Sequence, residues 1–253
     1  MGTLVISSGN EHMLPRTLEP EVMDTAAEAA DYDSMDHSSV NRLFVDDLLS
    51  AANAAGFADQ LTSRSNRLRV LDVGTGTAQI PIEFCQRPVN VDMVAIDLAV
   101  EMLLLAEQNI RDAGLHGSIL LEHVDAKELP FDDGEFDWVI SNSIVHHIPD
   151  PIDSLREMQR ILKPGGLLFV RDLLRPDSSE QVERLVQNYA GNDNDEQRQL
   201  FRQSLHAALT PAEMGELMKS LGWPASTVTQ TSDRHWTAFV VRHSRARANP
   251  EGT

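Results

Sequence analysis

Short apolar stretches alternate with amphipathic ones along the chain from Arg67 onward. Five of the stretches are apolar at nearly every position, as a parallel strand covered on both faces requires. The segment from Val100 to Ala113, in contrast, repeats its apolar residues at the spacing of one helix face. The alternation predicts a doubly wound α/β domain with helices on both faces of a mainly parallel sheet. The predicted strands are Leu68 to Val73, Val91 to Ile96, Ile119 to Val124, Trp138 to Ser141 and Leu167 to Leu173.

The C-terminal part of this pattern predicts a hairpin. Thr227 to Thr231 and Trp236 to Val241 both have strand character, and the four residues between them are too few for a crossover helix. We therefore predict that these two strands pair antiparallel. The polar stretch 177–210 is predicted to be a helical insertion over the active site. Leu162 to Gly166 is predicted to end a helix and turn into the fifth strand.

Two helices are predicted before the sheet begins. Glu21 to Ala30 follows Pro20 and is rich in Ala and Glu, and Val40 to Ala55 keeps apolar residues on one face. Ser38 or Ser39 is predicted to cap the second helix. The polar stretch between the helices, 31–37, is predicted to be a hinge.

These patterns divide the chain into parts. The predicted parts are a loose segment 1–19, a helical cap or lid 20–60, a main domain 61–243 and a tail 244–253.

Composition and charge exclude several kinds of partner. The 253 residues include 21 basic and 39 acidic side chains, which gives a net charge of −18. Such a chain repels nucleic-acid phosphates and anionic lipids, so we expect no nucleic-acid partner. Apolar runs of about five residues are far shorter than the roughly 18 that span a bilayer, so no membrane span is expected. Cys85 is the single cysteine, which fits a cytoplasmic location. A homodimer is left open.

A glycine-containing loop follows the first predicted strand. Gly74 and Gly76 permit positive φ and close approach of a ligand to the backbone. A dinucleotide loop needs a third glycine where Gln79 stands, and the carboxylate of Asp72 is badly placed for a pyrophosphate. The loop therefore favours a cofactor with a cationic group. An NAD-dependent oxidoreductase on a similar sheet is the alternative.

Carboxylates also stand at the ends of the next two predicted strands. Asp97, 21 residues after Gly76, is spaced to accept both hydroxyls of an adenosine ribose, with a helix N-cap as the structural alternative. Asp125 follows the third strand, where it can accept the amine of adenine or be a polar loop residue.

Taken in order, five blocks of this chain resemble the class I S-adenosylmethionine-dependent methyltransferases, in particular the small-molecule subfamily that includes the ubiquinone and menaquinone biosynthesis enzymes. The resemblance covers roughly residues 67–173 and implies a seven-stranded sheet in which the hairpin supplies the sixth and seventh strands. It also implies S-adenosyl-L-methionine as cofactor and S-adenosyl-L-homocysteine as product. The blocks are Leu71 to Thr77, Ala95 to Leu103, Asp125 to Phe131, Phe136 to Asn142 and Leu162 to Gly166.

The resemblance assigns residues to the cofactor. Asp72 and Gly74 would hold the methionine end, Asp97 the ribose, and Asp125 with Ala126 the adenine. Ala99 and Val100 replace a frequent Ser-Pro helix start, which removes a cap worth about 1 kcal/mol. The predicted cofactor-binding residues are Asp72, Gly74, Thr75, Gly76, Asp97, Leu98, Asp125, Ala126, Asn142 and Tyr32.

Tyr32 enters that set as part of the predicted lid. Together with Met35 and His37, it is placed to close over the sulfonium, and packing of the two N-terminal helices is the alternative.

The acceptor side is predicted after the fourth strand. One of His146 and His147 would act as a general base or orient the acceptor, and a structural histidine is the alternative. Because neighbouring residues point in different directions, no metal site is predicted for the pair. Arg171, Asp172 and Arg175 would meet an acceptor carboxylate or phosphate, or form ordinary surface ion pairs.

The sequence thus predicts an S-adenosylmethionine-dependent methyltransferase that moves a methyl group to an O, N or C atom of a small molecule. Asn142 is not followed by the two prolines and the aromatic residue of adenine-amino methyltransferases, which again disfavours nucleic acid. A non-catalytic S-adenosylmethionine-binding module is the second alternative.

Overall fold

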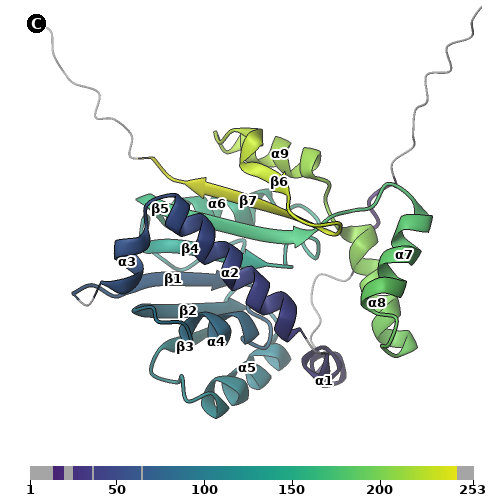
Figure 1. The fold of residues 1–253 in the computed structure, drawn as a ribbon, viewed down its shortest axis with the longest axis horizontal. Coiled ribbons are helices and arrows are strands. Elements are labelled where there is room, and N and C mark those ends of the chain that lie inside the picture. Colours follow the sequence, from purple (N-terminus) through teal and green to yellow (C-terminus); the bar gives the residue numbers. More distant parts are fainter. Residues whose placement is uncertain (1–13, 20–24, 36, 64, 244–253) are drawn as a thin grey trace, which may run out of the picture.

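The computed structural model describes residues 14–19, 25–35, 37–63 and 65–243, and every structural statement below concerns those residues. Within them, one seven-stranded sheet has the order β3-β2-β1-β4-β5-β7-β6 (Figure 1). Strands β1 to β5 are parallel, whereas β7 runs antiparallel to both β5 and β6. The strands are β1 Leu68–Val73, β2 Val91–Asp97, β3 Ile119–His123, β4 Phe136–Asn142, β5 Leu162–Leu173, β6 Val228–Gln230 and β7 His235–Val241.

Helices cover both faces of this sheet. One buried cluster joins Phe44, Phe84 and Ile110, from α2, α4 and α5, to the face of β1 that carries Val70. The other joins α6 and α9 to the opposite face, which carries Leu71. The helices are α1 Ala26–Ser34, α2 Ser38–Ala54, α3 Ala58–Thr62, α4 Gln79–Cys85, α5 Val100–Asp112, α6 Ile152–Ile161, α7 Ser179–Tyr189, α8 Asp195–Ala207 and α9 Pro211–Ser220, with a short 3₁₀ turn Ala225–Thr227.

This architecture confirms the fold class predicted from the sequence: a mainly parallel seven-stranded sheet with a C-terminal antiparallel hairpin and helices on both faces. The predicted first strand has the observed bounds. The ends of the other predicted parallel strands differ from the observed ends by at most two residues, except at the start of the fifth strand. Each of these strands is apolar at nearly every position because both faces are buried. This is a local property of the sequence, so the sequence alone reveals it.

The predicted hinge at 31–37 is wrong over its first part, because α1 continues to Ser34. A capping box between Thr25 and Glu28 fixes the start of that helix, with Glu28 N–H donating to the Thr25 hydroxyl. The predicted serine cap of α2 is also wrong. His37 is the N-cap residue there, and Ser38 and Ser39 lie inside the helix.

The fifth strand begins earlier than predicted. It starts at Leu162, directly after α6, because Leu162 pairs with Phe136 before the register of the β4–β5 ladder shifts at Trp138. The turn predicted at Leu162 to Gly166 therefore belongs to the strand.

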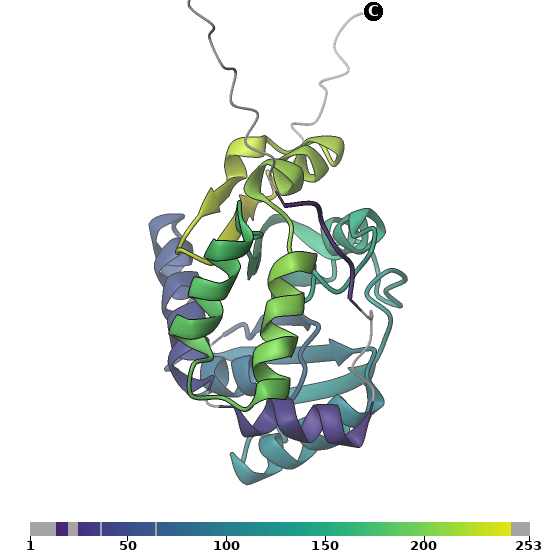
Figure 2. The same ribbon diagram turned by 90° about the vertical axis from the view of Figure 1, so that its right-hand side faces the viewer.

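Capping side chains fix the helices that stand over the carboxyl ends of the strands. Ser178 caps α7, and an Asn194–Gln197 capping box begins α8. These two helices fall within the predicted insertion 177–210, and Figure 2 shows them next to α1 at that end of the sheet. The strand order reverses between β1 and β4, the position at which open α/β sheets form a ligand crevice.

The division of the chain into a cap, a main domain and a tail stays a prediction. The tail 244–253 and residues 1–13 of the loose segment lie outside the described residues. In the described part of the chain, no helix has both the length and the apolar character needed to cross a membrane.

Candidate functional site

A cavity of about 580 Å³ lies at the carboxyl ends of the parallel strands. Its wall combines the ends of β1, β2 and β4 with residues of α1, α7 and α8. The ten residues predicted to bind the cofactor and the two predicted catalytic histidines all line it: Tyr32, Asp72, Gly74, Thr75, Gly76, Asp97, Leu98, Asp125, Ala126, Asn142, His146 and His147. The topology thus brings together side chains that are more than 100 residues apart in the sequence.

The backbone N–H groups of the glycine loop are already bonded within the protein. Gly74 and Thr75 both donate to the carbonyl of Ile96, at 2.9 Å each. Gly76 donates to Oδ2 of Asp97 at 2.7 Å. A pyrophosphate cradle requires such donors to face the ligand. The bonding of this loop therefore disfavours the NAD alternative.

Gly74 is required by its surroundings. Its φ is +74°, and a Cβ built on it would lie 2.5 Å from Cδ1 of Ile144. Gly76 has φ +54°, but a Cβ there would meet only Tyr32, at 3.8 Å. The first glycine thus permits close packing of the loop against the turn after β4, whereas the second mainly supplies backbone freedom.

Asp72 is an acid at the buried end of this loop, with 2% of its surface exposed. Burial raises the pKa of Asp72 to about 7, and the nearby Asp97 carboxylate adds to the rise. A buried carboxylate of this kind is stabilised by a cationic partner. The side chain therefore suits a ligand that carries an ammonium group.

Both oxygens of Asp97 accept backbone hydrogen bonds. Oδ2 accepts from Gly76, and Oδ1 accepts from Ala99 at 2.9 Å. Burial raises the pKa of this carboxyl, although these bonds oppose the rise. The N-cap residue of α5 is Ala99, so the N-cap alternative for Asp97 is wrong. Asp97 instead ties the glycine loop to the start of α5 and has further lone pairs for a ligand.

Asp125 is the more exposed acid at the third strand end. Its Oδ1 accepts from the backbone of Lys127 at 2.9 Å, and the Lys127 ammonium lies 3.5 Å from Oδ2. The turn holds the carboxylate beside Ala126 at the cavity wall.

Tyr32 reaches the cavity from α1. Its ring centroid lies 5.0 Å from that of His37, and it packs against a small apolar cluster that includes Ala99 and Met102. Burial raises the pKa of Tyr32 to about 12, with a further contribution from Asp97. The hydroxyl therefore stays protonated near neutral pH. Met35 and His37 also line the cavity.

His146 is held by Asp172 at the other end of the cavity. Oδ1 of Asp172 lies 2.5 Å from Nδ1 of His146, and Oδ2 accepts the His146 backbone N–H at 3.1 Å. Burial alone would lower the pKa of His146, but the Asp172 carboxylate raises it overall. Asp172 thereby fixes the orientation of the ring and leaves Nε2 on the opposite side.

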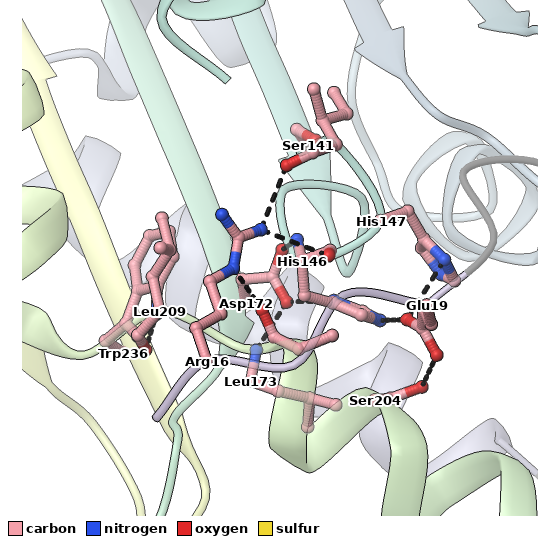
Figure 3. Close-up of polar contacts among 12 residues, drawn as sticks. Arg16, Glu19, Ser141, His146, His147, Asp172, Leu173, Ser204, Leu209 and Trp236 are labelled. Atoms are coloured by element: carbon pink, nitrogen blue, oxygen red, sulfur yellow. Dashed lines mark hydrogen bonds and ion pairs between the residues drawn. The ribbon is translucent and has the colours of Figure 1, made fainter. Parts of the chain in front are cut away.

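His147 lies beside His146, contrary to prediction. The two ring centroids are 4.2 Å apart and the rings are tilted by 34°. Both side chains face Glu19, as Figure 3 shows. The expectation that neighbouring side chains point apart is therefore wrong here, because both residues lie in the irregular turn between β4 and α6.

Sequence reasoning missed the contribution of residues 14–19. Arg16 donates to four backbone carbonyls, those of His146, Ile148, Pro149 and Ala207. The Thr17 N–H donates to the carbonyl of His206, so the segment also lies along the end of α8. These bonds bring Glu19 to the two histidines. The acid and arginine carried no periodic or motif signal that distinguished them from a loose lead-in.

The two arginines predicted near an acceptor have other roles. Arg171 donates to Asp47 of α2 at 2.7 Å and is buried, and Arg175 donates to Glu213 at 2.6 Å. Among the described residues, neither lines the cavity. Arg171 and Asp172 are successive residues of β5 and therefore point to opposite faces of the sheet. Arg171 and Arg175 thus form ion pairs with partly exposed carboxylates, as the ion-pair alternative predicted, and not an acceptor site.

Comparison with known families identifies the central part of the chain. Residues 71–170 match the family described as "Methyltransferase domain". These residues form a methyltransferase domain. The match contains the glycine loop, Asp97, Asp125 and both histidines. It confirms the resemblance to class I S-adenosylmethionine-dependent methyltransferases predicted from the sequence.

Curated relatives match the same stretch. The ubiquinone/menaquinone biosynthesis C-methyltransferase UbiE of Geobacter sp. (strain M21) is 38% identical over 109 residues, which cover 43% of this chain and 46% of the relative. The demethylmenaquinone methyltransferase of Bacillus subtilis is 34% identical over 110 residues, which cover 43% of this chain and 47% of the relative. The chain thus spans less than half the length of the curated relatives it matches.

A solved structure shares the fold over most of the chain. The plantazolicin methyltransferase BpumL, solved in complex with a monoazolic desmethylPZN analogue and SAH, has a TM-score of 0.62 at 16% identity, and the match covers 86% of this chain and 91% of the BpumL chain. The similarity shows that the fold extends beyond the methyltransferase domain match.

Part of the cavity wall lies outside that domain. Tyr32 comes from α1, and Leu200 and Phe201 come from α8. Glu19 is not a lining residue, but it contacts the two histidines that are. The methyltransferase domain therefore supplies the strand ends, whereas flanking segments enclose them.

Proposed function

We propose that this chain is an S-adenosylmethionine-dependent methyltransferase that transfers a methyl group to an O, N or C atom of a small-molecule acceptor. The observation that carries the proposal is the series of carboxylates at three neighbouring strand ends, Asp72, Asp97 and Asp125, along one cavity. The methyltransferase domain match and the similarity to ubiquinone/menaquinone biosynthesis C-methyltransferases support it.

The cavity fits this cofactor in size and in charge. Its volume of about 580 Å³ is in the range of small-molecule sites. Asp72, whose pKa is raised to about 7, gains a partner from the cofactor's ammonium group. Gly74, Thr75 and Gly76 would lie along the methionine end, and Asn142 beside them.

The nucleoside would occupy the next two strand ends. Asp97 and Leu98 would hold the ribose, with Asp97 accepting its hydroxyl groups. Asp125 and the backbone of Ala126 would hold the adenine. Tyr32, protonated at neutral pH, would cover the sulfonium from α1.

When bound, the cofactor supplies an electrophilic methyl group on a sulfonium, and the remaining requirement is in-line alignment of the acceptor. Holding two reactants in attack geometry contributes about 7–11 kcal/mol. His146 and His147 face the cavity on the acceptor side, where Asp172 fixes the first of them. They would orient the acceptor.

The acceptor pocket is partly apolar. Ile144, Ile148, Leu200 and Phe201 line it together with the two histidines. This combination favours a small organic acceptor with one polar group. Cytoplasmic location and homodimer formation stay predictions.

Calorimetric titration of the full chain with S-adenosylmethionine, S-adenosylhomocysteine and NAD tests the cofactor. We expect both sulfur compounds to bind and NAD not to bind; binding of NAD alone would reject the proposal. Transfer of a radiolabelled methyl group into metabolite extracts then tests catalysis. Tight cofactor binding without any labelled product would favour the non-catalytic module.

A further inference from the structure

Three side chains at the acceptor end direct their ligand atoms toward one point. Oε1 of Glu19, a ring nitrogen of His146 and one of His147 all lie within 4.8 Å of one another. Oε1 is 3.4 Å from Nε2 of His146 and 3.1 Å from Nδ1 of His147. Two ligands that are each about 2.1 Å from one metal ion are about 3.0–3.4 Å apart for octahedral or tetrahedral angles. Both measured separations agree with one coordination sphere.

We propose that Glu19, His146 and His147 bind a divalent first-row transition-metal ion. Two imidazoles and one carboxylate are a donor set of catalytic zinc and of non-haem iron. Magnesium and calcium prefer oxygen ligands and match this set less well. Zinc is therefore the appropriate probe.

The proposed ligands are themselves held in place. Asp172 lies against Nδ1 of His146, which directs Nε2 toward Glu19. Ser204 donates to Oε2 of Glu19 at 3.2 Å and leaves Oε1 for the ion. Such outer partners fix the orientation of ligands in known metal sites. Figure 3 shows both contacts around the two histidine rings.

Burial and charge at this position also favour a cation. The side chain of Glu19 is 7% exposed, and that of Asp172 is 1% exposed. Two carboxylates at this depth need compensating positive charge. A divalent ion on the Nε2 side of His146 would supply two charges directly to Glu19 and, through the ring of His146, to Asp172. Protonated histidines would supply the same charge without a metal, and the experiment below separates these two explanations.

Three protein ligands leave coordination positions open, as catalytic metal sites do. His146 and His147 line the cavity, so the open positions face the space assigned to the acceptor. The ion would bind an acceptor through oxygen, such as a phenol or an enol, with the hydroxyl proton passing to solvent. The acceptor-binding role of the ion rests on the proposed function, whereas the metal site itself does not.

The metal site is tested with the full chain, free of any affinity tag and stripped by a chelator. Calorimetric titration with zinc should show one ion per chain. Glu19→Gln and His146→Asn should each weaken zinc binding at least 10-fold. The exposed residues Glu196 and His116 provide the matched controls, and Glu196→Gln and His116→Asn should bind zinc like the unchanged protein.

S-adenosylhomocysteine binding shows separately whether each variant is folded. The proposal is overturned if the unchanged protein takes up no zinc, or if Glu19→Gln binds it equally tightly while still binding S-adenosylhomocysteine. The cluster would then be a carboxylate–imidazolium ion pair.

Cobalt supplies a second readout that does not depend on turnover. The absorption of the cobalt-loaded chain should change when a phenolic acceptor analogue is added. An unchanged spectrum in the presence of a bound analogue would overturn the acceptor role. Failure of the proposed methyl transfer, in contrast, would leave the zinc titration unaffected.

Discussion

The two ends of the cavity are built in different ways. The end proposed to bind the cofactor, called the cofactor end below, is a continuous set of strand tips in which backbone N–H groups hold the glycine loop and Asp97 in position. The end proposed to bind the acceptor, called the acceptor end below, is assembled from distant segments, where Arg16, His146 and Asp172 meet across three parts of the chain. A scaffold of paired strands fixes the first end, whereas side-chain contacts fix the second. Substitutions of single side chains that disturb the acceptor end should therefore leave the geometry of the cofactor end unchanged.

The largest effect is expected for Gly74→Ala. Its Cβ would meet Ile144 at 2.5 Å, and its φ of +74° is strained for alanine. Strain and overpacking together should cost about 3–5 kcal/mol of stability or of cofactor binding. Denaturant unfolding and calorimetry with S-adenosylhomocysteine measure this cost. Gly76→Ala is the matched control, because a Cβ there meets only Tyr32 at 3.8 Å. Equal losses in both variants would contradict the assigned role of Gly74.

The next effect is a pH dependence of cofactor binding that comes from Asp72. Since its pKa is raised to about 7, the carboxylate that pairs with an ammonium group is lost as the pH falls below neutrality. The dissociation constant of S-adenosylhomocysteine should rise about 30-fold between pH 8 and pH 5.5. Asp72→Asn should bind weakly with this dependence removed, whereas exposed Asp132→Asn should retain it. A pH profile unchanged in Asp72→Asn would exclude Asp72 as its source.

The free energy of unfolding should depend on pH in the opposite sense to cofactor affinity, because it falls as the pH rises. A raised carboxyl pKa in the folded protein means that stability is lost as the pH rises from about 4 to about 7. Asp72→Asn removes that loss. Thermal unfolding without cofactor should thus show Asp72→Asn to be more stable than the unchanged protein at pH 8, and no more stable at pH 4.

A smaller and more local effect is expected at the acceptor end. Arg16→Ala removes the bonds to four carbonyls that hold residues 14–19 against the histidine turn. Turnover should fall about 10-fold, which corresponds to the loss of hydrogen bonds from a charged donor. Cofactor affinity should change less than twofold. Arg202→Ala, which removes an exposed pair with Glu183, is the control and should leave both values unchanged. Loss of cofactor affinity in Arg16→Ala would show that the two ends are not separable.

The smallest expected effect is a gain in stability. Ala99 is the N-cap residue of α5, and an alanine there supplies no side-chain oxygen. Ala99→Ser should add about 0.5–1 kcal/mol to the free energy of unfolding. Urea denaturation of the cofactor-free protein measures the change. A decrease would mean that the tight packing of Ala99 against Met102 outweighs the cap.

The sequence predicted the cofactor end because its signals are local. Buried strands, glycines and acids at strand ends occur in fixed order, and the topology then places Asp72, Asp97 and Asp125 along one edge of the sheet. Their part in cofactor binding stays a prediction.

The acceptor end was harder to predict because its contacts depend on tertiary structure. Glu19 lies in a segment without periodicity, and the adjacent orientation of His146 and His147 comes from an irregular turn that the alternation rule does not describe. The sequence predicts a role for Asp172 near an acceptor, but its contact with His146 arises because the sheet places the end of β5 beside the turn after β4, which spacing along the chain does not reveal.

The successive residues Arg171 and Asp172 make the register of β5 unusually consequential. One side chain neutralises Asp47 of α2, and the other supports His146 on the opposite side of the sheet. A one-residue deletion earlier in β5 would turn both side chains to the other face, placing the Asp172 carboxylate opposite Asp47 and Leu173, without a carboxylate, beside His146. The pairing of β5 with β7 over Leu167 to Leu173 fixes this register and therefore keeps both charged side chains next to their partners.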